Sequence, residues 1–231
     1  TRLRITDGEK QIADWPIEVV SDTAPEISYL KPPAGTKRNL LALEYEVSDD
    51  YGVVDAMATI RRPDDAEILE GSPREITYNL PLPGIGPTEG RSRHVNDLTA
   101  HPWAGLQVFV QLAVTDAADQ TGETESFEML LPERTFQQPA ARMIIGARKQ
   151  LTIKPTDRES VYEALNAIST RPMLYNGDLG IFLAMRSAAH RLRYAPENAD
   201  GLASIQELLW TIALRIEDGE LALAERRLAE A

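Results

Sequence analysis

The chain has 231 residues, of which 43% are hydrophobic, so it is long enough for two domains with folded cores. Its net charge of −12 lies entirely in the first part, because residues 1–135 carry 12 Lys and Arg against 24 Asp and Glu, whereas residues 136–231 carry 12 of each kind. So acidic a surface repels phosphate groups, which argues against nucleic acid and an anionic membrane surface as partners of the first part.

Cysteines and long apolar segments are both missing from the sequence. Without cysteine, neither disulfides nor thiolate metal sites are available. No apolar run approaches the roughly 18 residues that a membrane-spanning helix needs, and no signal peptide opens the chain. Because the sequence begins with Thr1 rather than Met, we expect a fragment of a longer protein, so these absences concern this fragment alone.

The first 22 residues are expected to form a β-hairpin. Residues 1–20 resemble residues 112–131, because in each an apolar strand ends in Thr-Asp, a short polar turn follows, and a second apolar strand leads to a segment with proline. We interpret this as an internal repeat, in which residues 1–22 are the terminal hairpin of a preceding β-sandwich and residues 22–25 are a linker. The alternative is an unrelated hairpin with a common turn.

Residues 23–133 are expected to form an antiparallel β-sandwich of the immunoglobulin or fibronectin type. Turn signals separate seven short apolar segments, and the segment 106–114 alternates apolar residues with polar ones such as Gln107 and Gln111. Trp103, just before this segment, is expected to close one end of the sandwich. The expected strands are 27–30, 40–47, 53–61, 75–80, 91–98, 106–114 and 123–130.

Residues 81–90 are expected to form a loop, because three prolines and three glycines disfavour a strand interior. The spacing of Gly84, Gly86 and Gly90 misses the dinucleotide-binding fingerprint by one residue, and no helix follows. A phosphate-binding role is therefore not predicted.

Between residues 131 and 139 the apolar period changes from two to three or four, which predicts a small helical bundle over residues 137–231. Pro139 suits the first turn of a helix, and residues 156–159 have the pattern of a capping box. Asp218-Gly219 is expected to end the fourth helix, and Trp210 is expected to lie in the core. The five expected helices are 139–151, 156–171, 178–194, 200–217 and 220–231.

Five stretches occur together in this chain: APEISYLKPP, EYEVSDDYGV, DLTAHPWAGLQVFVQLAVTDAADQTGETE, LPERTF and LWTIALRIEDGELALAERRL. This combination resembles an alphaproteobacterial family of membrane-anchored proteins of unknown function with low-complexity tails, of the domain-of-unknown-function 4175 type. The resemblance implies transmembrane helices before Thr1, a periplasmic location at the inner membrane, and a helical Gln/Gly-rich continuation after Ala231. It implies no reaction and supplies no catalytic residues.

Acidic residues cluster where strands meet turns, at Asp49-Asp50 and at residues 116–119. Asp in such places usually accepts hydrogen bonds from nearby backbone amides, which is our interpretation. The alternative is a calcium site, but neither loop has the alternating D-x-D-x-D-G pattern. No metal site and no cofactor are predicted.

The three histidines, His94, His101 and His190, lack the spacing of metal ligands. Residues 90–94 begin like a nucleophile elbow, but His94 stands where the last glycine is required, which argues against a serine hydrolase. No catalytic residue is predicted.

Four basic residues, Arg142, Arg148, Lys149 and Lys154, lie at the start of the helical part. Two interpretations stay open for them. They are either solvated helix faces or a polar docking surface that holds the acidic sandwich at a fixed angle.

Two classes of function remain. The first is a non-catalytic periplasmic scaffold or protein–protein interaction region of a membrane-anchored cell-envelope protein. Its partner surface is expected at Leu221, Ala224 and Leu228, whose spacing of i, i+3 and i+7 makes an apolar stripe for a helical partner or for the chain's own continuation. That stripe alternatively packs on the fourth helix. The second class is an enzyme or enzyme subunit that acts on an envelope polymer through paired carboxylates.

Overall fold

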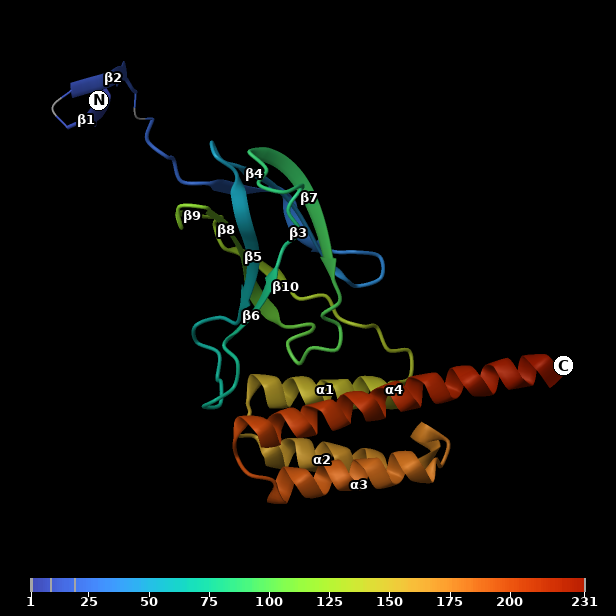
Figure 1. The fold of residues 1–231 in the computed structure, drawn as a ribbon. Coiled ribbons are helices and arrows are strands. Elements are labelled where there is room, and N and C mark those ends of the chain that lie inside the picture. Colours follow the sequence, from blue (N-terminus) through green and yellow to red (C-terminus); the bar gives the residue numbers. More distant parts are fainter. Residues whose placement is uncertain (1, 9, 19, 231) are drawn as a thin grey trace.

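The computed structural model describes residues 2–8, 10–18 and 20–230, with side chains described as far as residue 219. β-Sheets form the first part of the chain, and four α-helices follow among the described residues (Figure 1). Each part has its own cluster of buried apolar side chains. Within the described residues, none of the helices combines the length and the apolar character needed to span a membrane.

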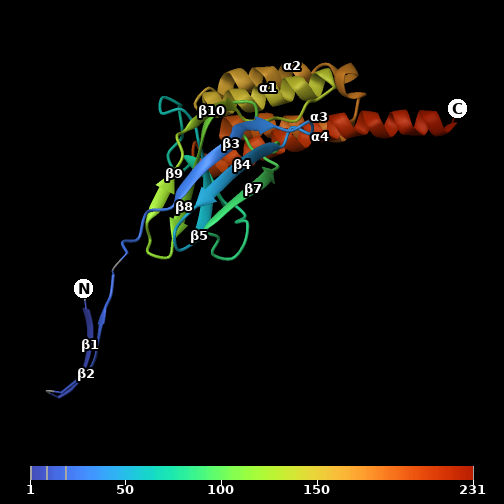
Figure 2. The ribbon, with the colours of Figure 1, turned by 90° about the horizontal axis from the view of Figure 1, so that it is seen from above.

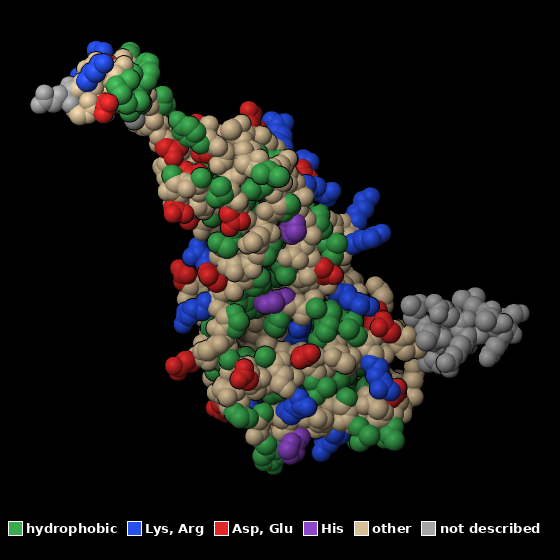
Figure 3. Space-filling view, in the orientation of Figure 1, with side chains coloured by type: hydrophobic (Ala, Val, Ile, Leu, Met, Phe, Trp, Pro, Cys, Tyr) green, Lys and Arg blue, Asp and Glu red, His purple; other side chains and the backbone are tan. Residues whose placement is uncertain are grey.

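The first two strands, β1 (Arg2–Asp7) and β2 (Lys10–Pro16), pair with each other in an antiparallel hairpin. The hairpin lies apart from the other elements in both ribbon views (Figures 1 and 2). Its largest apolar side chains are about half exposed, with Leu3 at 51%, Ile5 at 46% and Trp15 at 49%. Figure 3 shows apolar side chains gathered on this end of the molecule. The hairpin therefore contributes little to either core.

Two further sheets share one core. Strands β3 (Glu26–Gly35), β4 (Leu41–Ser48) and β7 (Glu89–Asn96) form a sheet in the order β3-β4-β7. The other sheet has the order β10-β8-β5-β6, made by β10 (Phe127–Leu130), β8 (Gln107–Asp116), β5 (Val53–Arg61) and β6 (Glu75–Asn79). A short strand, β9 (Thr121–Glu123), pairs with β8. Every strand pairing is antiparallel.

Alternation along the strands fills this core as the sequence predicts, because successive side chains of a strand point to opposite faces. Every second residue of β4 and of β8 is buried. Trp103, also buried, joins the same cluster just before β8. The buried hydrophobic residues of the two strands are Leu41, Leu43, Tyr45, Val47, Val108, Val110, Leu112 and Val114.

The single strand expected over residues 123–130 is wrong, since β9 and β10 are separate. Thr124 lies between them and bonds to Leu112 twice. Its backbone N–H donates to the Leu112 carbonyl at 2.9 Å, and its Oγ1 accepts from the Leu112 N–H at 3.0 Å. A side chain thus takes a place in the ladder that a backbone carbonyl would otherwise occupy, and the regular pairing is interrupted there.

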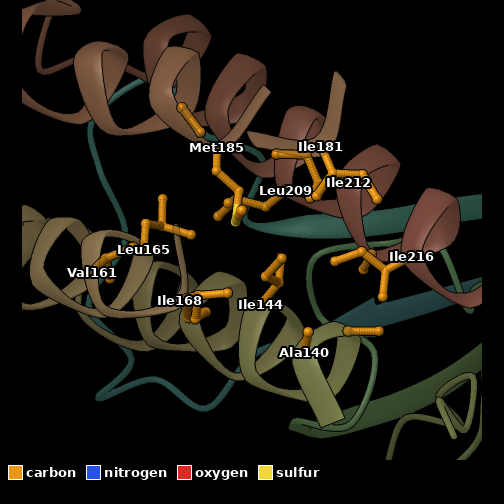
Figure 4. Close-up of a cluster of buried hydrophobic side chains, with 14 of the residues drawn as sticks. Ala140, Ile144, Val161, Leu165, Ile168, Ile181, Met185, Leu209, Ile212 and Ile216 are labelled. Carbon is orange, nitrogen blue, oxygen red and sulfur yellow. The ribbon is translucent and has the colours of Figure 1, made fainter. Parts of the chain in front are cut away.

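The helical part consists of α1 (Pro139–Ile153), α2 (Arg158–Ser169), a 3-10 turn η1 (Pro172–Tyr175), α3 (Leu179–Tyr194) and α4 (Ala199–Glu230). Each α-helix turns apolar side chains toward the same centre (Figure 4). Ile144, Leu165, Met185 and Leu209, one from each helix, are all fully buried. Trp210 is partly buried and meets Phe136 edge-on, with the ring centroids 5.6 Å apart.

Two predictions about helix ends are wrong. The break expected at Asp218-Gly219 does not occur, and α4 continues as one helix from Ala199 to Glu230. A glycine inside a helix costs only about 1 kcal/mol relative to alanine, which a long helix tolerates. The expected capping box is also absent: the N-cap of α2 is Asp157, whose carboxylate accepts from the Ser160 N–H, whereas the Thr156 hydroxyl donates to Glu67 Oε1 at 2.8 Å.

The loop expected over residues 81–90 ends at residue 88, because Glu89 and Gly90 already pair in β7, and this loop packs against the turn that contains Gly52. Gly52 has a φ of +107°, and a Cβ added there would lie 2.5 Å from the Gly86 carbonyl oxygen. We therefore expect Gly52→Ala to lower the free energy of unfolding by about 2 kcal/mol, measured by urea denaturation. Gly86→Ala is the control, because Gly86 has a φ of +56° and open space at its Cβ position. Equal losses in the two variants would contradict the close packing.

Candidate functional site at the junction of the sheets and the helices

The turn of residues 97–103, between β7 and β8, contacts the helices. Hydrogen bonds within the turn hold its shape. Asp97 Oδ1 accepts from the Thr99 hydroxyl at 2.6 Å and from the Thr99 N–H at 3.0 Å, and these bonds lower the pKa of Asp97. The Trp103 N–H donates to Nδ1 of His101 at 3.2 Å. The carbonyls of residues 100–102 are thereby available to side chains of the helical part.

Arg148 on α1 donates hydrogen bonds to two of those carbonyls. Its guanidinium donates to the Ala100 oxygen at 2.6 Å, to the His101 oxygen at 3.4 Å, and through Nε to the Gln206 oxygen on α4 at 2.9 Å. The same group lies over the Trp210 ring, 5.1 Å from its centroid. Burial lowers the pKa of Arg148 to about 10, so it stays charged at neutral pH. One buried cation therefore connects the turn, α1 and α4.

A second buried contact lies beside Arg148. The Gln206 side-chain amide donates to Thr152 Oγ1 at 2.9 Å, and this hydroxyl lies 3.2 Å from the Pro102 carbonyl oxygen. Gln206 and Thr152 are both buried. Polar groups of α1 and α4 thus satisfy one another and the turn, as buried polar groups must.

Of the four basic residues at the start of the helical part, two contact the rest of the molecule and two face solvent. Arg148 contacts the turn, and Lys149 forms an ion pair with Glu133 at 2.5 Å, whereas Arg142 and Lys154 are exposed. The acceptors of Arg148 are backbone carbonyls, so the acidic charge of the sheets is not what holds it. The sequence did carry a signal for its burial, because Arg148 stands four residues after Ile144 and three before Leu151, on the apolar face of its helix.

The start of α1 is capped from a distant part of the chain. Gln138 at the N-cap makes no side-chain bond, and no acidic residue lies in the first turn. Instead, the Glu217 carboxylate on α4 accepts from the backbone N–H groups of Gln137 and Gln138, at 2.7 and 2.9 Å. A carboxylate at this position satisfies free N–H groups and complements the helix dipole.

Glu217→Ala is expected to lower the free energy of unfolding by about 1 kcal/mol, because it removes this cap. Chemical denaturation followed by circular dichroism at 222 nm measures the loss. Glu207→Ala is the matched control, since Glu207 is an exposed residue of the same helix and its carboxylate makes no hydrogen bond or ion pair among the described residues. If Glu217→Ala is as stable as Glu207→Ala, the cap does not contribute to stability.

In each of the two acidic turns, an aspartate accepts hydrogen bonds from backbone N–H groups of the same turn. Asp49 Oδ2 accepts from the N–H groups of Tyr51 and Gly52, and Asp116 Oδ1 accepts from those of Ala118 and Gln120. The interpretation of these aspartates as acceptors for backbone amides is confirmed. Among the described residues, no group of three or more His, Asp or Glu is arranged to hold a metal ion.

Calcium is therefore expected to leave the melting temperature unchanged. Calcium in proteins takes six to eight oxygen ligands. One oxygen of Asp49 and one of Asp116 already accept hydrogen bonds from the backbone of their own turns. Thermal unfolding with millimolar calcium, and again with a chelator, measures this. A rise of several degrees that the chelator reverses would contradict it.

Two clefts flank the turn. One, of about 240 Å³, lies between the loop of residues 62–73, the turn and the start of α4. The other, a more open groove of about 540 Å³, is lined by Asp97, Arg148, Glu207 and Trp210 among others. The two clefts share His101 and Pro102 of the turn and Ala203 of α4, so these residues form the wall between them.

The remaining residues singled out in the sequence lie elsewhere. Leu221, Ala224 and Leu228 belong to the last part of α4, where side chains lie outside the described residues. His94 lies against Tyr78 and His190 against Tyr194, with ring centroids 5.5 and 4.6 Å apart. Neither of these histidines reaches the junction, and His101 alone of the three takes part in it.

The chain belongs to the family of the domain of unknown function DUF4175, whose model matches residues 1–231. This confirms the resemblance to the domain-of-unknown-function 4175 type. A search of curated proteins found no match for this chain. Because the family description names no activity, the function has to be argued from the geometry of the molecule.

Proposed function

We propose that this chain is a non-catalytic scaffold and protein–protein interaction region of a cell-envelope protein, on the periplasmic face of the inner membrane and anchored by segments outside residues 1–231. In this proposal residues 1–22 complete a neighbouring β-sandwich, residues 23–133 form an immunoglobulin-like sandwich, and residues 137–231 form a helical domain. The observation that most supports this proposal is the exposed apolar face of the hairpin β1-β2.

The order of the strands supports the immunoglobulin-like assignment. If the strands after the hairpin are lettered from β3, leaving out β9, then β10, β8 and β5 follow the order G-F-C of immunoglobulin domains, with F in the centre. Strands β3, β4 and β7 take the places of A, B and E. The fourth strand, β6, pairs with β5 at the edge of the G-F-C sheet.

The similarity between residues 1–20 and residues 112–131 indicates which kind of surface covers the hairpin. Aligning Thr6-Asp7 with Thr115-Asp116 places Leu3 and Ile5 at the positions of Leu112 and Val114. In β8 those two residues are fully buried in the core shared with the sheet β3-β4-β7. In the hairpin, Leu3 lies opposite Trp15 and Ile5 opposite Ala13, which puts four apolar residues on one face. The occupant that fits this face is a second sheet of the same kind, from the preceding part of the same polypeptide.

One double substitution in two lengths of chain tests this proposal. Leu3→Asp with Ile5→Asp should leave the melting temperature of residues 1–231 unchanged, because the hairpin packs on neither core there. In the full-length protein it should lower the free energy of unfolding by about 3 kcal/mol and make residues 17–25 sensitive to protease. Lys10→Asp, on the same hairpin, should change neither. A full-length protein indifferent to the double substitution would overturn the proposal.

A second partner surface is proposed at Leu221, Ala224 and Leu228, on the sequence pattern given above. Its occupant in this proposal is an amphipathic helix of a partner protein. Leu221→Asp with Leu228→Asp in the full-length protein should abolish cross-linking to that helix at position 224 and leave the melting temperature unchanged. Cross-linking that persists in a folded double variant would exclude this surface.

The enzyme alternative, which acts on an envelope polymer, gains no specific support. Asp97 and Glu207 line the same groove, yet hydrogen bonds from Thr99 lower the pKa of Asp97. A general acid in a carboxylate pair needs a raised pKa. This alternative stays a prediction without an assigned pair.

A further inference from the structure

The smaller cleft at the junction has a mostly apolar wall and one unpaired cation. It holds about 240 Å³ between the loop of residues 62–73, the turn of residues 101–103 and the start of α4. This volume lies below the 300–1,000 Å³ usual for drug-sized ligands, so the cleft suits a smaller molecule. Its apolar wall includes Ile68, Leu69, Pro102, Trp103, Leu202 and Ala203.

Arg62, at the end of β5, supplies the cation. Its side chain is partly buried, and its Nε atom is fully buried without a hydrogen-bond partner among the described residues. Burial also lowers the pKa of Arg62. The two arginines that are buried as whole residues differ from it, because Arg148 and Arg158 each donate to backbone carbonyls. A buried donor left without an acceptor is destabilising, so the Nε atom of Arg62 favours a ligand that brings an acceptor.

Apart from the Ser72 hydroxyl, the other polar side chains of the wall already have hydrogen-bond partners. Glu67, the one carboxylate among the lining residues that the structure describes, accepts from Thr156 and forms no ion pair with Arg62. Thr152 and Gln206 bond to each other, and His101 accepts from the Trp103 N–H. The chemistry left for a ligand is therefore the Arg62 guanidinium and the Ser72 hydroxyl beside apolar side chains.

We propose that this cleft binds a small monocarboxylic acid with an apolar body, such as a medium-chain fatty acid. The carboxylate takes two N–H groups of Arg62 in the parallel geometry that guanidinium groups offer to carboxylates. The apolar chain packs against Ile68, Leu69 and Leu202. The ligand thus supplies both the acceptor that Arg62 lacks and the apolar area that the wall requires. This inference does not depend on the scaffold proposal.

Octanoate is the probe, and isothermal titration calorimetry with residues 1–231 measures its binding. Octanol has the same chain without the charge and is expected to bind at least tenfold more weakly. Octylammonium, which carries the opposite charge, is expected not to bind. Adsorption to the exposed apolar side chains of the hairpin would show the opposite pattern, because it would favour octanol and would not depend on Arg62.

Arg62→Met keeps most of the side-chain volume and removes the charge, so it should weaken octanoate at least tenfold. Arg61→Met is the matched control: Arg61 is exposed, bonds to Gln111 at 3.2 Å, and should leave the affinity unchanged. If Arg62→Met fails to fold, Arg62→Lys retains the charge without the fork and should show an intermediate loss. Methyl resonances of Leu202 should shift with octanoate while those of Val110 do not. No octanoate binding, equal binding of octanol, or equal binding by the Arg62 variants would overturn the proposal.

Discussion

Arg148→Met is expected to lower the free energy of unfolding by about 4 kcal/mol, because it removes the charged donor of the Ala100, His101 and Gln206 carbonyls. The His101 oxygen keeps the Ala104 N–H as a donor, so its share of the loss is the smaller one. Each such loss is worth about 1–3 kcal/mol, and the stacking on Trp210 adds about 1 kcal/mol, although such effects do not sum fully. Methionine was chosen because it keeps the apolar stem of the side chain. The loss should be measured by urea unfolding at neutral pH.

The control for this substitution is Arg142→Met, at an exposed position of the same helix. It should change stability by less than about 0.5 kcal/mol, as surface substitutions usually do. Limited proteolysis provides a second measurement, since Arg148→Met should open the turn of residues 97–103 before either core unfolds. Equal stability of the two variants would show that Arg148 does not fix the junction.

Acidification from pH 7 to pH 4 is expected to remove about 3 kcal/mol of stability through His101 alone. Burial, and then the nearby charge of Arg148, lowers the pKa of His101 from 6.5 to about 4. The unfolded chain takes up this proton near pH 6.5, so between the two values the unfolded state holds more protons than the folded state. The contribution is therefore complete above about pH 6.5 and is lost as the pH falls toward 4.

Carboxylates titrate in the same range, so the test compares variants. Free energies of unfolding measured from pH 4 to pH 7 should show a shallower slope for His101→Gln, which keeps a side-chain acceptor for the Trp103 N–H. His190→Gln is the control, because His190 is exposed on α3 and lies outside the junction. If the two slopes are the same, His101 is not the group that responds to acid.

The features that sequence predicted well are local ones. The alternation along β8, the bounds of β5 and the turn at Asp49 follow from residues within a few positions of each other. Helix ends were less predictable, because they depend on partners far away in the chain. Glu217 caps α1 from about 80 residues downstream, and no pattern near Gln138 announces it.

The candidate site was hidden for the same reason. Arg62 stands next to Pro63 at a strand end, which in sequence looks like a solvated position. Its burial arises only when the following loop reaches α1 and α4, whose lining residues lie 90 to 144 positions later. Arg148 is the partial exception, since its place on an apolar helix face could have been noticed.

The contact between Arg148 and the turn has a consequence for how the protein tolerates genetic change. Its acceptors are main-chain oxygens, which every amino acid carries, so replacing the side chain of Ala100 does not remove an acceptor. No other natural side chain supplies a planar fork of donors to three oxygens at once. Drift in the turn is thus largely silent, whereas the charged contact to these main-chain oxygens depends on the one codon of position 148.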